Sequence, residues 1–87
     1  MRMVYSGLIF DTDSSSKLHS AILPTFPLTN TTATVYKTSK GTVFMTVQVG
    51  GQETVHSIDH TEIIQFLGDT QAPLDVYTAM GVALEEA

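Results

Sequence analysis

The strongest secondary-structure signal lies in residues 33–58, ATVYKTSKGTVFMTVQVGGQETVHSI. Its β-branched and aromatic residues come in short runs separated by turn signals, a pattern typical of antiparallel strands. SKG suits a three-residue hairpin loop with Gly41 in the left-handed conformation, and Gly50-Gly51 suits a two-residue primed turn. The sequence therefore predicts a three-stranded meander over residues 32–38, 42–49 and 52–58.

The lengths of these two turns also predict which residues lie opposite each other. The first turn places Val35 opposite Met45, and the second places Met45 opposite His56. The face predicted to form the core carries Ala33, Val35, Val43, Met45, Val47, Val49, His56 and Ile58. The other face carries Thr34, Tyr36, Phe44, Thr46, Val55 and Ser57. On this second face Tyr36 opposes Phe44, an aromatic pair that either stabilises the two strands or anchors a binding surface.

The segment before the meander predicts another hairpin, Met3–Phe10 with Leu18–Leu23, joined by the polar loop DTDSSSK. Residues 23–28, LPTFPL, contain two prolines and cannot form a central strand, because proline lacks the amide that a ladder needs. We expect this segment at a sheet edge or as a crossing loop, with Phe26 either packed under the sheet or exposed for a partner.

The periodicity after the meander predicts two short helices. The first has Asp59 as its N-cap, Glu62 three residues later as in a capping box, and Gly68 as its stop signal. Its apolar stripe is Ile63, Ile64, Phe66 and Leu67. The second begins with Pro73 at the first helical position, buries Leu74, Tyr77 and Met80, and ends at Gly81-Val82. We therefore expect an α+β fold, with an antiparallel sheet of about five hairpin-linked strands followed by two helices on one face.

Composition indicates a single folded domain over residues 1–87. Hydrophobic residues make up 43% of the chain and charged residues 15%, which fits a packed core better than a disordered tail. The absence of cysteine excludes disulfides and thiolate metal sites. No apolar run approaches the ~18 residues of a membrane span. We expect the chain to act in the cytoplasm, without a membrane or a cofactor.

Charge is distributed unevenly along the chain. Residues 1–40 contain four basic and two acidic residues, a net charge of +2, whereas residues 41–87 contain seven acidic and no basic residues, a net charge of −7. Direct nucleic-acid binding needs a basic footprint, and this pattern argues against it. The acidic half predicts either a surface that attracts a basic protein or a solubilising face.

The stretch GLIFDTDSSS, residues 7–16, resembles the motif of haloacid-dehalogenase-type phosphatases, in which a buried strand runs into Asp-x-Asp. The resemblance would make Asp11 a nucleophile and Asp13 a general acid/base. It also implies a doubly wound parallel sheet, for which this chain has no room. A polar hairpin loop with local hydrogen bonds is the simpler interpretation of these residues.

Two metal sites are conceivable from the sequence. Asp11 and Asp13 resemble the start of a calcium loop, but Ser16 and Ile22 stand where the loop needs glycine and glutamate. The cluster from His56 to Glu62 offers imidazole and carboxylate ligands, although the predicted strand-to-helix junction divides it. No nucleophile elbow or phosphate-binding glycine loop is present. We therefore assign no catalytic or metal residues.

These observations favour a small, acidic, non-enzymatic protein-binding module. One concrete form is an inhibitor of the kind that phages and plasmids direct against host defence complexes, including CRISPR systems. These complexes have basic surfaces that bind nucleic acid, and an acidic protein can occupy such a surface. The predicted contact residues are Tyr36, Phe44, Glu53, Glu62, Asp69 and Asp75. One alternative is a structural or regulatory homo-oligomer, such as a homodimer. The other is a metal-dependent enzyme that uses Asp11 and Asp13 or the cluster from His56 to Glu62.

Overall fold

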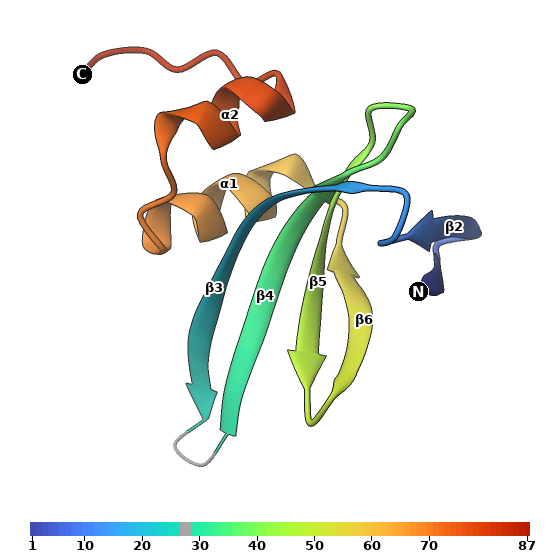
Figure 1. The fold of residues 1–87 in the computed structure, drawn as a ribbon. Coiled ribbons are helices and arrows are strands. Elements are labelled where there is room, and N and C mark those ends of the chain that lie inside the picture. The colour runs from blue at the N-terminus through green and yellow to red at the C-terminus, as the bar shows by residue number, and fades with distance from the viewer. Residues whose placement is uncertain (27–28) are drawn as a thin grey trace.

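The structure is a computed structural model that describes residues 1–26 and 29–87, with side chains for residues 1–23 and 31–87. The described residues form six antiparallel strands in two sheets, followed by two helices (Figure 1), which confirms the predicted α+β class. The elements are β1 (Arg2–Tyr5), β2 (Leu8–Asp11), β3 (Ser16–Phe26), β4 (Thr29–Lys37), β5 (Val43–Val49), β6 (Gln52–Ser57), α1 (His60–Asp69) and α2 (Leu74–Met80).

The larger sheet is a meander with the strand order β3-β4-β5-β6. The first predicted turn is confirmed: Gly41 has a φ of 90°, and the Thr38 amide donates to the Thr42 carbonyl at 2.8 Å. Val35 therefore lies opposite Met45, as the turn length predicts. This three-residue turn holds the two central strands in register along their whole length.

The second turn is also confirmed, but the register that it predicts fails near the end of β6. Gly50 and Gly51 have φ values of 58° and 84°, as a type I′ turn requires. The predicted pairing holds as far as Thr46 opposite Val55, and then a register shift places Ser57 opposite Met45.

This shift corrects the predicted pairing of His56 with Met45. Ser57 is only 3% exposed, and its hydroxyl accepts the Asp59 amide at 3.0 Å, whereas the side chain of His56 is 47% exposed. The bulge therefore keeps an imidazole out of the apolar core and turns the chain towards α1. Ile58, predicted to pair within the meander, follows the end of β6.

The predicted N-terminal hairpin is wrong in its pairing. Ser6 and Gly7 both have positive φ, 51° and 75°, and form a tight turn inside the segment that was predicted as one strand. β1 and β2 consequently pair with each other as a separate two-stranded sheet, and β3 pairs with β4. The loop over residues 12–15 joins the two sheets instead of closing a hairpin.

β3 is an edge strand of the larger sheet, in agreement with the prediction for the proline-containing segment. Pro24 lies within β3, at the irregularity between Leu23 and Phe26 where the register with β4 shifts, so it has no paired residue on β4. The predictions for Pro27, Leu28 and the side chain of Phe26 lie outside the described residues.

The first helix begins as predicted but ends later. The Asp59 side chain accepts the Thr61 amide at 3.1 Å. Gly68, the predicted stop, lies inside α1; instead Gln71 adopts a φ of 56°, and the Ala72 amide donates to the carbonyl of Leu67 at 3.0 Å, closing a Schellman motif. A glycine inside a helix costs only about 1 kcal/mol relative to alanine, so contacts of the last turn can extend the helix past it.

The second helix ends at Gly81, as predicted, with a φ of 80°. Pro73 is its N-cap rather than its first helical residue, a difference of one position. Leu74, predicted in the buried stripe, is 71% exposed; Val76 and Met80 make the buried contacts. A seven-residue helix has room for only one short stripe, and here it begins at the third residue.

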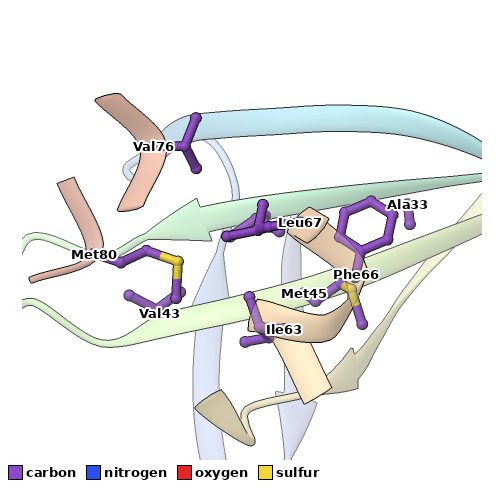
Figure 2. Packing of buried hydrophobic residues seen from close by; sticks show 9 residues of the cluster. Ala33, Val43, Met45, Ile63, Phe66, Leu67, Val76 and Met80 are labelled. Atoms are coloured by element: carbon purple, nitrogen blue, oxygen red, sulfur yellow. The ribbon is translucent and has the colours of Figure 1, made fainter. Parts of the chain in front are cut away.

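The main core lies between the helices and one face of the larger sheet. Figure 2 shows side chains of α1 pointing towards the sheet, with Met80 of α2 near Val43 of β5. The buried members of this cluster are Ala33, Val35, Val43, Met45, Ile63, Phe66, Leu67, Val76 and Met80. The core therefore joins β4 and β5 to both helices.

Candidate functional site

The four carboxylates predicted to contact a partner do not share one surface. Glu62 and Asp69 lie exposed on α1, and Asp75 lies exposed on α2. Glu53 lies on β6, is half-buried, and reaches the face of the sheet opposite the helices. The structure therefore separates Glu53 from the other three.

Glu53 is bound within the protein by two hydroxyl groups. Its Oε2 atom accepts hydrogen bonds from Thr46 Oγ1 at 2.6 Å and from the Tyr36 hydroxyl at 3.2 Å. Burial raises the pKa of Tyr36, and the negative charge of Glu53 raises it further. These two hydrogen bonds hold the Glu53 carboxylate against β4 and β5. We therefore assign Glu53 a structural role and remove it from the predicted partner-binding residues.

Phe44 has no exposed surface with which to contact a partner. It is 0% exposed and lies between two other rings, Tyr36 at 5.2 Å and Phe10 at 4.7 Å between ring centroids. Phe10 belongs to β2, so the small hairpin covers this part of the sheet. The aromatic pair identified in the sequence thus contributes to a second core, and only Tyr36 retains partial exposure.

The two helices, which we call the helix layer, carry negative charge without basic residues. Residues 41–87 contain no lysine or arginine. Lys37 reaches the layer from β4, but its ammonium group donates to the carbonyl of Ala79 at 2.7 Å. Glu62 contacts His56, the one ion pair of this layer among the described residues. The exposed carboxylates of the layer and its N-cap are Asp59, Glu62, Asp69 and Asp75.

The predicted cluster between His56 and Glu62 is only partly assembled. His56 Nε2 lies 3.0 Å from Glu62 Oε1, while the carboxylate of Asp59 accepts the Thr61 amide. Glu62 therefore turns towards the histidine, and the Asp59 amide is bound by Ser57, so the predicted capping box does not form. Within the described part of the chain, no three His, Asp or Glu side chains are placed to hold a metal ion.

The loop that contains Asp11 and Asp13 makes local hydrogen bonds. The Asp13 amide donates to Asp11 Oδ1 at 3.0 Å, and the Ser15 hydroxyl donates to the Asp11 carbonyl at 2.7 Å. The Met1 ammonium donates to Asp13 Oδ2 at 2.8 Å, a bond that raises the pKa of this amine. These contacts are those of a polar turn closed by its own side chains.

One pocket, which no sequence pattern predicts, lies between the β1–β2 hairpin and the turn that joins β4 to β5. Its volume is about 630 Å³, and its lining includes Arg2, Ile9, Asp11 and Lys40. The sequence indicates only that every lysine and arginine lies within residues 1–40. It does not indicate that two of them line one pocket, because this depends on the unpredicted pairing of β1 with β2.

Comparisons of the chain with models of protein families, with curated proteins and with solved structures find no match. Among the described residues, neither helix has the length and apolar character needed to cross a membrane.

Proposed function

We propose that this protein is a non-enzymatic binding module that docks a basic protein surface through its helix layer. The observation that supports the proposal is the net negative charge of this layer: Glu62 contacts His56, whereas Asp69 and Asp75 have no ion-pair partner among the described residues. Exposed carboxylates of the same sign create a negative potential that attracts and orients a positively charged partner. The contact residues of the proposal are Glu62, Asp69 and Asp75, with Glu53 and Phe44 removed.

An exposed leucine supports the same surface. Leu74 is 71% exposed and directly precedes Asp75 at the start of α2. An apolar side chain next to carboxylates can supply the desolvated contact that charges alone do not provide. Basic proteins that bind nucleic acids offer the matching chemistry, and blocking such a protein is the inhibitory role that we propose.

A homo-oligomer is the alternative function. A dimer formed through the aromatic face of the sheet is not favoured, because Phe10 covers Phe44. A dimer through the outer edge of β3 is the version that the topology allows, since β3 ends the strand order of the larger sheet. Light scattering of the purified protein distinguishes a dimer from a monomer.

The test of the proposal is capture of a partner with matched charge variants. The variant Asp69→Asn/Asp75→Asn removes two charges from the helix layer, and Asp11→Asn/Asp13→Asn removes two from the N-terminal loop. The immobilised proteins are incubated with lysate of the source cell, and captured proteins are identified by mass spectrometry. We expect a basic protein that the wild type and the loop variant retain and the helix-layer variant loses.

Salt dependence provides the second measurement. Raising the salt concentration from about 0.1 M to about 1 M shortens the Debye length from about 10 Å to about 3 Å, so an electrostatic complex should weaken strongly. Equal capture by both variants, or capture that is insensitive to salt, would contradict docking through the helix layer. Circular dichroism of each variant confirms that the fold is retained.

A further inference from the structure

The pocket beside the N-terminal hairpin has a size suited to a small molecule. Its volume of about 630 Å³ lies within the range of about 300–1,000 Å³ that is usual for ligand sites. One wall comes from β2 and the loop that follows it, and the other comes from the turn between β4 and β5. The pocket lies between two tight turns. Positive φ angles and hydrogen bonds fix the geometry of these turns.

Two cations line this pocket, and Asp11 lies opposite one of them, Arg2, in the pairing of β1 with β2. Arg2 lies on β1 and Lys40 at the tip of the β4–β5 turn, and both are exposed. Within the described residues, neither side chain has an ion pair or hydrogen bond. The chain carries a net charge of −5 and has four basic residues, so half of its cations line one pocket.

Hydroxyl groups also line the pocket. Ser39 and Thr42 line the pocket beside Lys40, and their hydroxyls have no hydrogen-bond partner within the described part of the protein. Asp11 is the carboxylate of the lining, but its Oδ1 atom accepts the amide of Asp13. The donors available to a ligand are therefore a guanidinium, an ammonium and hydroxyl groups, a set that suits an anion.

Part of the β2 wall of the pocket is apolar. Leu8 and Ile9 line it and are 50% and 60% exposed, which leaves aliphatic surface uncovered next to the charged groups. Inorganic anions gain nothing from such a wall, whereas an organic group attached to the anion would cover it.

We propose that this pocket binds a small organic phosphate, a phosphate monoester whose phosphate lies between Arg2 and Lys40 and whose organic part covers Leu8 and Ile9. Arginine binds phosphate through its planar fork and lysine as a point charge. A phosphate dianion has three terminal oxygens for two cations and the nearby hydroxyls, and a carboxylate has only two. This site shares no residue with the helix layer, so it is independent of the proposed protein-binding function.

Amide chemical shifts of ¹⁵N-labelled full-length protein test this proposal, with phenyl phosphate as the probe and inorganic phosphate and benzoate as comparators. We expect saturable shifts confined to the lining and its immediate neighbours, which are Arg2, residues 6–11, residues 14–15 and residues 38–42. The apolar wall should make phenyl phosphate bind about fourfold or more tightly than inorganic phosphate. Benzoate should bind more weakly than phenyl phosphate. Equal affinity of the three probes would overturn the proposal.

Lysine variants provide the matched control. Lys40→Gln and Lys17→Gln each remove one exposed positive charge, but Lys17 does not line the pocket. Loss of a charge-assisted hydrogen bond predicts that Lys40→Gln weakens phenyl phosphate binding about tenfold or more, while Lys17→Gln changes it less than about twofold. Equal weakening by the two variants, or shifts dispersed over the whole protein, would show nonspecific attraction and refute the site. Lys40 lies in an exposed turn, so its variant should fold normally.

Discussion

The two faces of the four-stranded sheet are both covered, but by different chemistry. On the helix side, Val35 and Met45 are 0% and 3% exposed and belong to an apolar cluster with Leu67. On the opposite side, Thr34 and Thr46 are 7% and 1% exposed although they carry hydroxyl groups. One face of the same strands therefore packs hydrocarbon, and the other packs a polar network beside an aromatic cluster.

The two faces contribute to stability in different ways. Apolar contact is non-directional and scales with the area removed from water, so it responds mainly to lost volume. The polar face depends on particular partners: Thr34 Oγ1 lies 3.1 Å from Ser20 Oγ, and Thr46 donates to Glu53. Removal of one partner leaves a buried polar group unsatisfied. We expect the helix side to be sensitive to cavities and the opposite side to lost hydrogen bonds and to pH.

The largest expected effect is a cavity on the helix side. Leu67 is 0% exposed, and Leu67→Ala should lower the free energy of unfolding by about 2–5 kcal/mol. The control is Leu74→Ala, because Leu74 is 71% exposed and should change stability by less than about 0.5 kcal/mol. Urea denaturation measures both. Similar losses in the two variants would contradict the placement of the core.

The next effect concerns the hairpin that covers the opposite side. Phe10→Ala removes the ring that contacts Phe44, and an isolated two-stranded hairpin is marginally stable. We expect the free energy of unfolding to fall by about 2–3 kcal/mol. This is at or below the usual cost of truncating a buried phenylalanine, because the hairpin can detach while the helix-side core remains. Hydrogen exchange should show lost protection in β1 and β2 and retained protection in β4 and β5. The control is Val4→Ala, at a position that is 75% exposed. It should leave the amides of both pairs of strands protected.

A smaller effect should come from the polar network itself. Glu53→Ala leaves the buried Thr46 hydroxyl without its acceptor and should cost about 1–3 kcal/mol. Thr46→Val removes the donor, and the double variant should then cost less than the sum of the two single changes. Denaturant unfolding of the four proteins gives the coupling energy. Additive losses would show that the short contact contributes nothing specific.

The order and type of the elements could be predicted from local signals, and the central register could be predicted from turn length. Gly41, Gly50 and Gly51 fix two turns through positive φ, and these turns determine the pairing of β4 with β5 and most of that of β5 with β6. The bulge at the end of β6 could not be predicted in this way. It follows from a tertiary preference, in which Ser57 bonds to the start of α1 and His56 stays in contact with Glu62.

The end of α1 shows the same limit of local reasoning. Gly68 is a strong local stop signal, yet the helix continues to Asp69 with Thr70 as its C-cap. The Thr70 hydroxyl donates to the Phe66 carbonyl at 2.8 Å and lies 2.9 Å from His19 Nε2. Because Thr70 uses its proton on the carbonyl, His19 is the donor of the second bond. This contact links β3 to α1 across 51 residues of sequence, a distance that no local pattern can indicate.

The candidate site was less predictable than the fold. Charge counts along the sequence identify an acidic second half, and Glu62, Asp69 and Asp75 do lie exposed in the helix layer. The same counts cannot tell that Glu53 accepts two internal hydrogen bonds. Alternation along β5 likewise places Phe44 on the second face without showing that β2 covers it. The error at Phe44 follows from the unpredicted position of the N-terminal hairpin, and the error at Glu53 follows from hydrogen bonds between side chains of the meander.

The smallest expected effect is the pH response of the polar face. Burial and the charge of Glu53 raise the pKa of Tyr36 in the folded protein above the ordinary value of 10.0. The folded state therefore holds this proton more tightly than the unfolded state, and the resulting stabilisation is fully present below pH 10. It is lost as the pH rises above 10 through the raised native pKa. Phenolate absorbance should show one of the three tyrosines ionising later than the others.

Tyr36→Phe provides the control for this titration. It removes the late ionisation and should flatten the fall of stability above pH 10, while Thr46 still donates to Glu53 and keeps the carboxylate bonded. At neutral pH its cost should be about 0.5–1.5 kcal/mol, the usual net value of one hydrogen bond. Leu67 belongs to the helix-side cluster, which does not include Tyr36, so Leu67→Ala should shift the whole stability curve without changing its slope above pH 10. Parallel curves for Tyr36→Phe and wild type would instead show that alkaline sensitivity does not arise from the polar face.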